Sequence, residues 1–177
     1  KTRAKAAAEY FRANADRWDE IRSLHVSEQE VEGALQEVIG KEPIGDFLDI
    51  GTGTGRILEV FAPLISRGTG IDLSHEMLQV ARVKLEQAGY RHCQVRHGDM
   101  YNLQLPANEF DVVVLHQVLH YAEEPGSVIS EAAQTLRTGG RLLVVDFATH
   151  DQEFLRTEHQ HRWLGFQPEQ VAGWCAA

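Results

Sequence analysis

The chain has 177 residues, with 17 Lys and Arg against 26 Asp and Glu, so its formal net charge at pH 7 is −9. This length and a hydrophobic fraction of 43% are typical of one globular domain and exclude a disordered, collagen-like or coiled-coil chain. The acidic balance argues against non-specific nucleic-acid binding, which requires a basic face. No apolar run approaches the roughly 20 residues of a membrane span. Two cysteines, Cys93 and Cys175, are too few for a disulfide framework, so a cytoplasmic location is expected.

Residues 4–40 are predicted to be helical. An alanine-rich stretch at residues 4–8 favours a helix strongly. Ser27 and Glu30 have the spacing of a capping box, which predicts that a second helix begins at Ser27. Apolar residues recur at helical spacing after it, and Gly40 is placed to end this helix.

From Pro43 onward, short apolar runs alternate with amphipathic segments. The predicted strands are residues 47–50, 69–72, 93–96, 110–115 and 141–147. The predicted helices are residues 57–65, 77–89, 128–136 (closed by Gly139 and Gly140), 151–163 and 168–177. This alternation predicts an α/β fold: a Rossmann-like, doubly wound and mainly parallel sheet with helices on both faces.

A glycine-rich turn, residues 49–56 with the sequence DIGTGTGR, follows the first predicted strand and opens a helix. Unpaired backbone N–H groups and the positive end of the helix dipole lie at such a position. A dinucleotide fingerprint would have a third glycine where Arg56 stands, and a phosphate loop would require Lys and Ser or Thr after a later glycine. The turn therefore predicts a nucleoside-like ligand rather than a pyrophosphate or triphosphate.

Two further acids follow the second and third predicted strands. Asp72 stands about 20 residues after Gly51, where an acid can accept hydrogen bonds from both ribose hydroxyls. Asp99 can accept a hydrogen bond from an exocyclic amine, and Met100 can pack on a purine. A helix N-cap for Asp72 and a turn residue for Asp99 are the structural alternatives. Several carboxylates near the ligand favour one that carries positive charge.

With these motifs in place, the chain resembles the class I S-adenosylmethionine-dependent methyltransferases over about residues 43–150. The matching segments are residues 47–55, 70–74, 98–100, 110–114 and 136–143, in the family's order and spacing. The resemblance implies strand order 3-2-1-4-5, with closing strands expected beyond Ala177. It implies a helical lid over residues 1–40 and a methyltransferase domain over residues 41–177 that is incomplete at its C-terminal end.

The resemblance also implies roles for individual residues. The glycines would lie against the methionine and ribose parts of S-adenosylmethionine, Asp49 would hold its amino-acid end, and Asp72 would bind the ribose diol. Asp99 and Met100 would bind adenine, while His116 would lie near the sulfonium. The full expected cofactor-binding set is Asp49, Gly51, Thr52, Gly53, Gly55, Asp72, Leu73, Met77, Gly98, Asp99, Met100 and His116.

Within this family, the N-terminal helices resemble the lid of quinone-biosynthesis methyltransferases. Residues 18–22, 116–120 and 161–166 are similar to methyltransferase domains fused behind an ArsR-type winged-helix repressor. That similarity implies a DNA-binding domain before Lys1, with no direct nucleic-acid contact through this segment. The alternative to an enzyme is therefore a domain that senses S-adenosylmethionine or its demethylated product. A homodimer is one possible oligomeric state. An NAD-dependent oxidoreductase is disfavoured by Arg56.

Methyl transfer to a small molecule requires a base only when the nucleophile must lose a proton. The candidates are His116, His120 and Tyr121, with Asp146 and His150 also near strand ends. A structural role is the alternative for each histidine. No metal site is expected, because the nine histidines are scattered and the Asp146–His150 spacing fits a strand end followed by a turn.

Overall fold

The computed structural model describes residues 2–23, 27–147, 162–163 and 165–176. Its centre is a five-stranded sheet with the order β3-β2-β1-β4-β5, and all four pairings are parallel. The strands are β1 Ile44–Ile50, β2 Ile65–Asp72, β3 Cys93–His97, β4 Phe110–His116 and β5 Leu136–Val145. The predicted parallel sheet and its strand order are confirmed.

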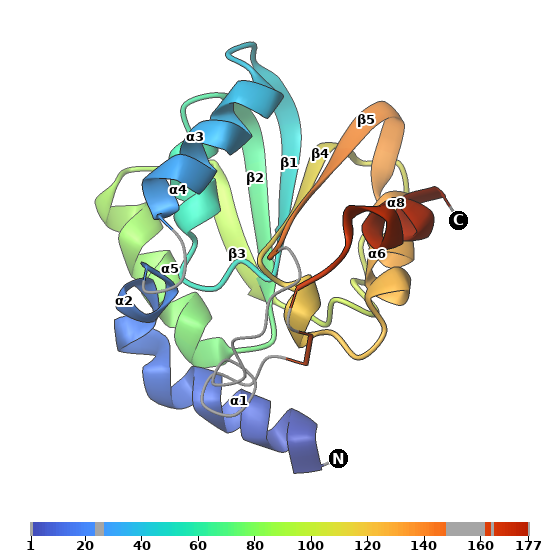
Figure 1. The fold of residues 1–177 in the computed structure, drawn as a ribbon. Helices are drawn as coiled ribbons and strands as arrows, with labels where there is room; N and C mark the ends of the chain where they lie inside the picture. Colours follow the sequence, from blue (N-terminus) through green and yellow to red (C-terminus); the bar gives the residue numbers. More distant parts are fainter. Residues whose placement is uncertain (1, 24–26, 148–161, 164, 177) are drawn as a thin grey trace.

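Helices cover both faces of this sheet (Figure 1). Helices α3, α4 and α5 lie on one face and α6 and α8 on the other, while α1 lies beyond the carboxyl ends of the strands. The described helices are α1 Thr2–Asn14, η1 Ala15–Arg17, α2 Trp18–Ser23, α3 Glu28–Ile39, α4 Arg56–Phe61, α5 His75–Gln87, η2 Leu119–Tyr121, α6 Pro125–Gln134 and α8 Pro168–Ala176. None of these helices has the length and apolar character required to span a bilayer.

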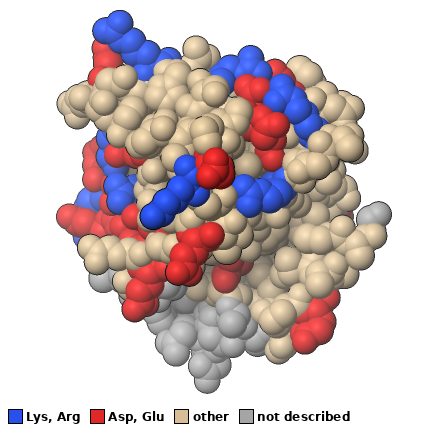
Figure 2. All heavy atoms as spheres, turned by 90° about the horizontal axis from the view of Figure 1, so that it is seen from above, with Lys and Arg blue, Asp and Glu red and all other residues tan. Residues whose placement is uncertain are grey.

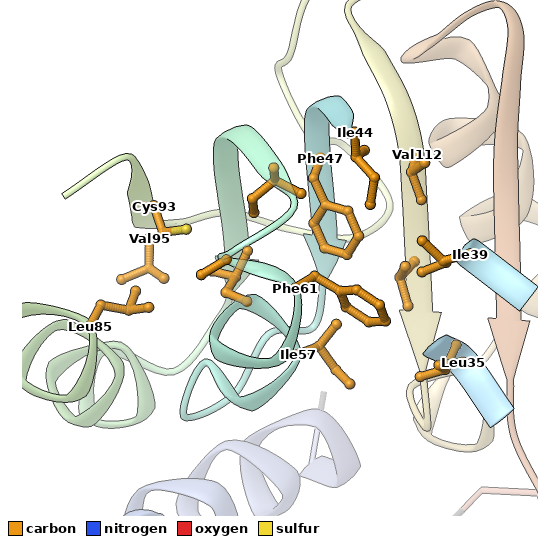
Figure 3. Packing of buried hydrophobic residues seen from close by; sticks show 14 of the residues in the cluster. Leu35, Ile39, Ile44, Phe47, Ile57, Phe61, Leu85, Cys93, Val95 and Val112 are labelled. Carbon is orange, nitrogen blue, oxygen red and sulfur yellow. The ribbon is translucent and has the colours of Figure 1, made fainter. Parts of the chain in front are cut away.

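The two central strands bury side chains on both faces. In β1, Phe47 packs on the side of α4 while Leu48 faces the opposite cluster, and both are fully buried. Val112 and Val113 alternate in the same way in β4. Figure 3 shows the first cluster, in which the rings of Phe47 and Phe61 lie 5.6 Å apart. An unbroken apolar run is expected for strands covered on both sides, and these clusters hold the strand ends in place.

Two predicted element boundaries are wrong. Helix α4 ends at Phe61, and Ile65 begins β2 rather than completing the helix. Pro63 explains the early end, because proline has no N–H for a helical hydrogen bond. Strand β5 begins at Leu136, and the predicted glycine helix stop lies inside it. Gly139 has φ 81° there, next to a register shift in the β4–β5 pairing, so this glycine allows an irregular strand rather than ending a helix.

The predictions for the helix after Ser27 and for the two C-terminal helices differ in how they agree with the structure. Ser27 is the N-cap of α3, but its side chain makes no capping hydrogen bond; its carbonyl instead accepts the Val31 N–H at 3.2 Å. The capping box is therefore wrong in its side-chain detail, although the helix start is confirmed. Gly40 is the C-cap with φ 88°, as predicted. Helix α8 confirms the predicted last helix, whereas the predicted helix at residues 151–163 falls almost entirely outside the described residues.

Ion pairs connect the amino ends of the strands. Arg67 pairs with Asp46 at 2.7 Å and with Glu109 at 2.8 Å, and Arg137 pairs with Asp46 and Asp111, both at 2.8 Å. Figure 2 views the molecule from above and shows basic and acidic side chains next to one another on that face. These side chains pair with one another at the amino end of the sheet, opposite the end at which the glycine turn lies.

Candidate functional site

A cavity of about 570 Å³ lies at the carboxyl ends of the strands. Small-molecule sites in proteins have volumes of roughly 300–1,000 Å³. Parallel strands end at one edge of a sheet, so residues far apart in sequence meet there. The lining residues at or just after the carboxyl ends of β1, β2, β3 and β4 include Gly51, Asp72, Met100 and His116. Helices α1 and α2 contribute Tyr10, Phe11 and Trp18.

The glycine turn after β1 has a backbone that only glycine adopts readily. Gly51, Gly53 and Gly55 have φ angles of 73°, 55° and 82°. The N–H groups of Gly51 and Thr52 donate to the Ile71 carbonyl at 2.8 and 2.9 Å, which joins this turn to the end of β2. Gly51, Thr52 and Gly53 line the cavity. Gly55 lies outside the lining, as the N-cap of α4.

Asp72 joins the ends of β1 and β2. Its Oδ2 accepts the Gly53 N–H and its Oδ1 accepts the Ser74 N–H, both at 2.9 Å. Ser74, not Asp72, caps α5, since its hydroxyl accepts the Met77 N–H at 3.2 Å. The N-cap alternative for Asp72 is therefore wrong. Burial raises the pKa of Asp72, while the N–H groups of Ser74 and Gly53 and the charge of His97 act in the opposite direction.

Most of the other residues expected to contact the cofactor also line the cavity. Asp49 is 2% exposed there, whereas Leu73 is 56% exposed. Asp99 is the exception: it is exposed, lies outside the lining, and accepts the Tyr101 N–H at 2.9 Å within a turn. The expected residues that line the cavity are Asp49, Gly51, Thr52, Gly53, Asp72, Leu73, Met77, Gly98, Met100 and His116.

Aromatic side chains form one wall of the cavity. Phe11 meets Trp18 at 5.3 Å and Tyr121 at 5.0 Å between ring centroids, both edge to face. Tyr10 meets Phe11 at 5.6 Å, and burial raises the pKa of Tyr10 to about 12. This aromatic wall, formed by Tyr10, Phe11, Trp18 and Tyr121, joins α1 and α2 to the η2 turn that follows β4.

Asp19 attaches α2 to the glycine turn. Its Oδ1 accepts the Thr54 hydroxyl at 2.8 Å, and its Oδ2 forms an ion pair with Lys84 of α5. No sequence pattern predicted this contact, because Asp19 and Thr54 are 35 residues apart and belong to different elements. The N-terminal helices are therefore bonded directly to the loop that would hold a nucleoside.

Asp19→Ala is expected to loosen the N-terminal helices and to weaken ligand binding at the turn about fivefold. The variant loses the hydrogen bond to Thr54 and the partly exposed ion pair with Lys84, which together contribute about 1 kcal/mol. Hydrogen exchange of the α1 and α2 amides should become faster. Glu20→Ala is the matched control, because Glu20 lies on the same helix and forms an exposed ion pair with Arg17 at 3.4 Å. Equal exchange in the two variants would contradict the attachment.

A buried histidine–aspartate pair lies beside the aromatic wall. His120 Nδ1 lies 2.7 Å from Asp146 Oδ1, and the two side chains are 2% and 4% exposed. The Phe147 N–H donates to the same oxygen at 2.9 Å, and the His120 ring lies 4.1 Å from that of Tyr121. His120 lines the cavity. The two partners are 26 positions apart in the sequence, so no local pattern revealed the pair, although the predicted neighbouring of β4 and β5 was a signal that could have done so.

The three predicted catalytic candidates differ in what they can do. His116, His120 and Tyr121 all line the cavity. Burial raises the pKa of Tyr121 far above its usual value, and the charges of Tyr10 and Asp146 add to this effect. Tyr121 therefore keeps its proton at neutral pH and cannot act as a base. His150 lies outside the described residues, and the described ones contain no cluster of three or more side chains suited to a metal ion.

Comparison with known proteins decides the family. Residues 48–144, more than half of the chain, match a family described as a methyltransferase domain. The chain belongs to this family. Phosphatidylethanolamine N-methyltransferase of Cereibacter sphaeroides is 37% identical over 109 residues, which cover 61% of this chain and 53% of that protein. The chain spans about half or less of the length of the first curated relatives that it matches.

Solved structures show the same fold as this methyltransferase domain. The YcgJ protein of Bacillus subtilis has a TM-score of 0.73 at 23% identity, over 82% of this chain and 66% of that one. Phosphoethanolamine N-methyltransferase 2 of Haemonchus contortus, solved in complex with S-adenosyl-L-methionine, has a TM-score of 0.71 at 21% identity, over 83% and 36%. These likenesses establish the fold, and the chemistry must be argued from the cavity.

Proposed function

We propose that this methyltransferase domain transfers the methyl group of S-adenosylmethionine to a small molecule bound in the cavity. The observation that supports this most directly is the carboxylate of Asp72, bonded to the Gly53 N–H at 2.9 Å where β1 and β2 end. A carboxylate at this position can accept hydrogen bonds from a ribose diol. The family membership and the relatives' names favour methyl transfer over other reactions of nucleoside ligands.

The residues present fit this cofactor. Thr52 Oγ1 is buried without a hydrogen-bond partner among the described residues, and Thr52 lines the cavity together with Gly51 and Gly53. Asp49, Asp72 and Glu76 line the cavity, and their negative charge favours a ligand with a sulfonium and an ammonium group. Leu73 and Met100 offer apolar surface for adenine. S-adenosylmethionine would supply an activated methyl group, while the chain would orient the acceptor and exclude water.

We propose turnover rather than sensing of the cofactor. The cavity continues beyond the glycine turn to His120, Tyr121 and the aromatic wall, which leaves room for a second ligand. A sensor would require only the part of the cavity next to the glycine turn, where the cofactor would bind. The similarity to domains fused with ArsR-type regulators is an expectation from the sequence alone. The cytoplasmic location and the homodimer are also expectations from the sequence alone.

The proposal is tested first by calorimetric titration. S-adenosylmethionine and S-adenosylhomocysteine are expected to bind, and NAD is not, because Arg56 occupies the place of the third glycine in a dinucleotide site. Binding of NAD alone would rule out the proposed function. Incubation with methyl-labelled S-adenosylmethionine and a metabolite extract should then yield labelled small molecules. Cofactor binding without any labelled product would favour the sensor.

A further inference from the structure

We infer that the methyl acceptor carries a carboxylate or phosphate group and that the guanidinium of Arg162 holds this group in the cavity. This inference rests on the proposed function and deepens it, because it names the chemical class of the acceptor and the residue that selects it. It follows from three features of the described residues: a partly buried arginine without a partner, the bonds that fix its backbone to the cavity wall, and the distribution of charge along the cavity.

Arg162 differs from the other partly buried cations. Among the lysines and arginines whose side chains the structure describes, three are partly buried: Arg56, Lys84 and Arg162. Arg56 pairs with Glu32 at 2.6 Å, and Lys84 pairs with Asp19. The Arg162 side chain forms no ion pair, hydrogen bond or ring contact with any residue that the structure describes. A charge withdrawn from water requires a partner, so this guanidinium is placed to receive one from a ligand.

Hydrogen bonds fix the backbone of Arg162 to the wall of the cavity. The Arg162 N–H donates to the His120 carbonyl at 2.7 Å, and the Trp163 N–H donates to the same oxygen at 3.0 Å. The indole N–H of Trp163 donates to the Ala122 carbonyl at 2.9 Å. These bonds join Arg162 to the η2 turn, and Arg162 lines the cavity. A binding group on a fixed backbone loses less freedom when a ligand arrives, which favours a specific site.

Helix α1 brings two further cations to the same end of the cavity. Lys5 and Arg12 line the cavity and lie about two helical turns apart, so both project from one face of α1. Phe11, the neighbour of Arg12, contacts Tyr121 of the η2 turn at 5.0 Å between ring centroids. Arg12 therefore reaches the cavity next to the turn to which Arg162 is bonded.

The carboxylates of the cavity gather mainly at its other end. Asp49, Asp72 and Glu76 belong to the ends of β1 and β2 and to α5, where the proposed function places the cationic cofactor. Glu9 and Glu123 also line the cavity, but both are exposed, so water and salt screen their charges. The charge of a partly buried guanidinium is screened less. The acceptor end of the cavity can therefore attract an anion although the chain has a net charge of −9.

The shape of the guanidinium group selects an oxyanion. Its planar N–H groups match two oxygens of a carboxylate or phosphate at once, and such charge-assisted hydrogen bonds are stronger than those between neutral groups. A cationic acceptor would be repelled by Lys5, Arg12 and Arg162, and a neutral one would leave the Arg162 guanidinium without a charged partner. The anionic group therefore orients the acceptor and leaves another of its atoms to face the methyl group.

The inference is tested by calorimetry on protein saturated with S-adenosylhomocysteine, which has no methyl group to transfer. The probes are benzoate, phenyl phosphate, benzamide and benzylammonium, which combine a phenyl ring with a carboxylate, a phosphate, a neutral amide or a cation. Benzoate or phenyl phosphate is expected to bind about tenfold or more tightly than benzamide, and benzylammonium more weakly than benzamide. The tighter of the two anions shows which group the acceptor carries.

Replacement of Arg162 should remove this preference. In Arg162→Gln the affinity for the preferred anion should fall about tenfold or more, as expected when a charge-assisted hydrogen bond is lost, while that for benzamide should change little. Arg162→Lys keeps the charge but not the planar donors, so a loss of about threefold is expected. Arg82→Gln is the matched control, because Arg82 is exposed and outside the cavity lining. The same loss of charge should there leave the preference unchanged.

The preferred anion should also compete with the natural acceptor. When the protein methylates a metabolite extract with labelled S-adenosylmethionine, this anion should lower the labelling, and more extract should restore it. Benzamide at the same concentration should have little effect. Arg162→Gln should raise KM for the extract about tenfold with little change in kcat, because the anionic group is held equally before and during methyl transfer. Labelling that the preferred anion does not lower would overturn the inference.

The outcomes separate this inference from the proposed function. Titration of each variant with S-adenosylhomocysteine shows whether the fold and the cofactor site are intact, and Arg162→Lys decides if Arg162→Gln does not fold. Loss of that binding in the unaltered protein would contradict the proposed function. If it binds but neither anion does, if benzamide or benzylammonium binds as tightly as the anions, or if Arg162→Gln keeps the preference, the inference is overturned while the proposed function stands. An equal loss in Arg82→Gln would overturn it as well, because only the net charge would then matter.

Discussion

Asp72→Ala is expected to weaken S-adenosylmethionine binding about 100-fold or more. The carboxylate of Asp72 would accept hydrogen bonds from both ribose hydroxyls, and each bond to a charged acceptor contributes about 1.5–3 kcal/mol. Two such bonds give at least about 3 kcal/mol, or roughly two powers of ten in Kd. The alanine also removes the acceptor for the N–H groups of Gly53 and Ser74, which loosens the glycine turn. Calorimetry gives the Kd directly.

Two further variants show what the carboxylate contributes. Asp72→Asn keeps one acceptor oxygen, so a smaller loss of about tenfold is expected. Asp16→Ala removes the same charge from an exposed residue outside the cavity lining and should leave the Kd unchanged. A similar loss in Asp16→Ala would show that only the net charge matters. An unchanged Kd in Asp72→Ala would remove Asp72 from the site.

The same carboxylate predicts how binding depends on pH. Burial is the main cause that raises the pKa of Asp72, so it takes up a proton at a higher pH than an exposed aspartate does. The protonated group is a poorer acceptor. Affinity for the cofactor should therefore be full above this raised pKa and fall as the pH decreases through it. Asp72→Asn should remove this dependence, and a persistent dependence in that variant would assign it to another group.

Gly51→Ala is expected to destabilise the fold by about 3 kcal/mol and to distort the cavity. The backbone of Gly51 has φ 73°, where a side chain costs about 1–2 kcal/mol. A Cβ would also lie only 2.4 Å from Val118 Cγ2, and overpacking of this kind costs about 1–3 kcal/mol. Thermal unfolding should show a Tm lower by roughly 10 °C.

A matched glycine and a double variant separate the two causes. Gly33 lies in α3, where an added Cβ would meet no neighbouring atom within 4 Å, so Gly33→Ala should stabilise the helix by about 0.5–1 kcal/mol. Gly51→Ala combined with Val118→Ala removes the clash but keeps the unfavourable φ. It should be less destabilised than the sum of the two single changes by about 1 kcal/mol. If the free-energy changes of the two single variants simply added, the contact between the new Cβ and Val118 would be relieved in another way.

The local sequence predicted for a simple reason that the glycine turn and the end of β2 line one cavity. Gly51 and Gly53 lie in the turn that follows β1, and Asp72 is the last residue of β2. The carboxyl ends of parallel strands meet at one edge. A correct strand order therefore sufficed to bring them together. Asp99 met the same criterion but forms a turn with Tyr101, because the direction of a side chain at a loop depends on local hydrogen bonds that a motif does not specify.

The sequence by itself determined the parallel sheet and the glycine turn, because the apolar periodicity and the turn residues act over short distances. The strand order followed from the resemblance of its motifs to the methyltransferase family. Only the tertiary structure decided which polar side chains meet in the cavity. His120 and Asp146, and likewise Asp19 and Thr54, come together from separate elements at hydrogen-bond distance. Such pairings depend on the packing of whole helices and strands, so no local pattern encodes them.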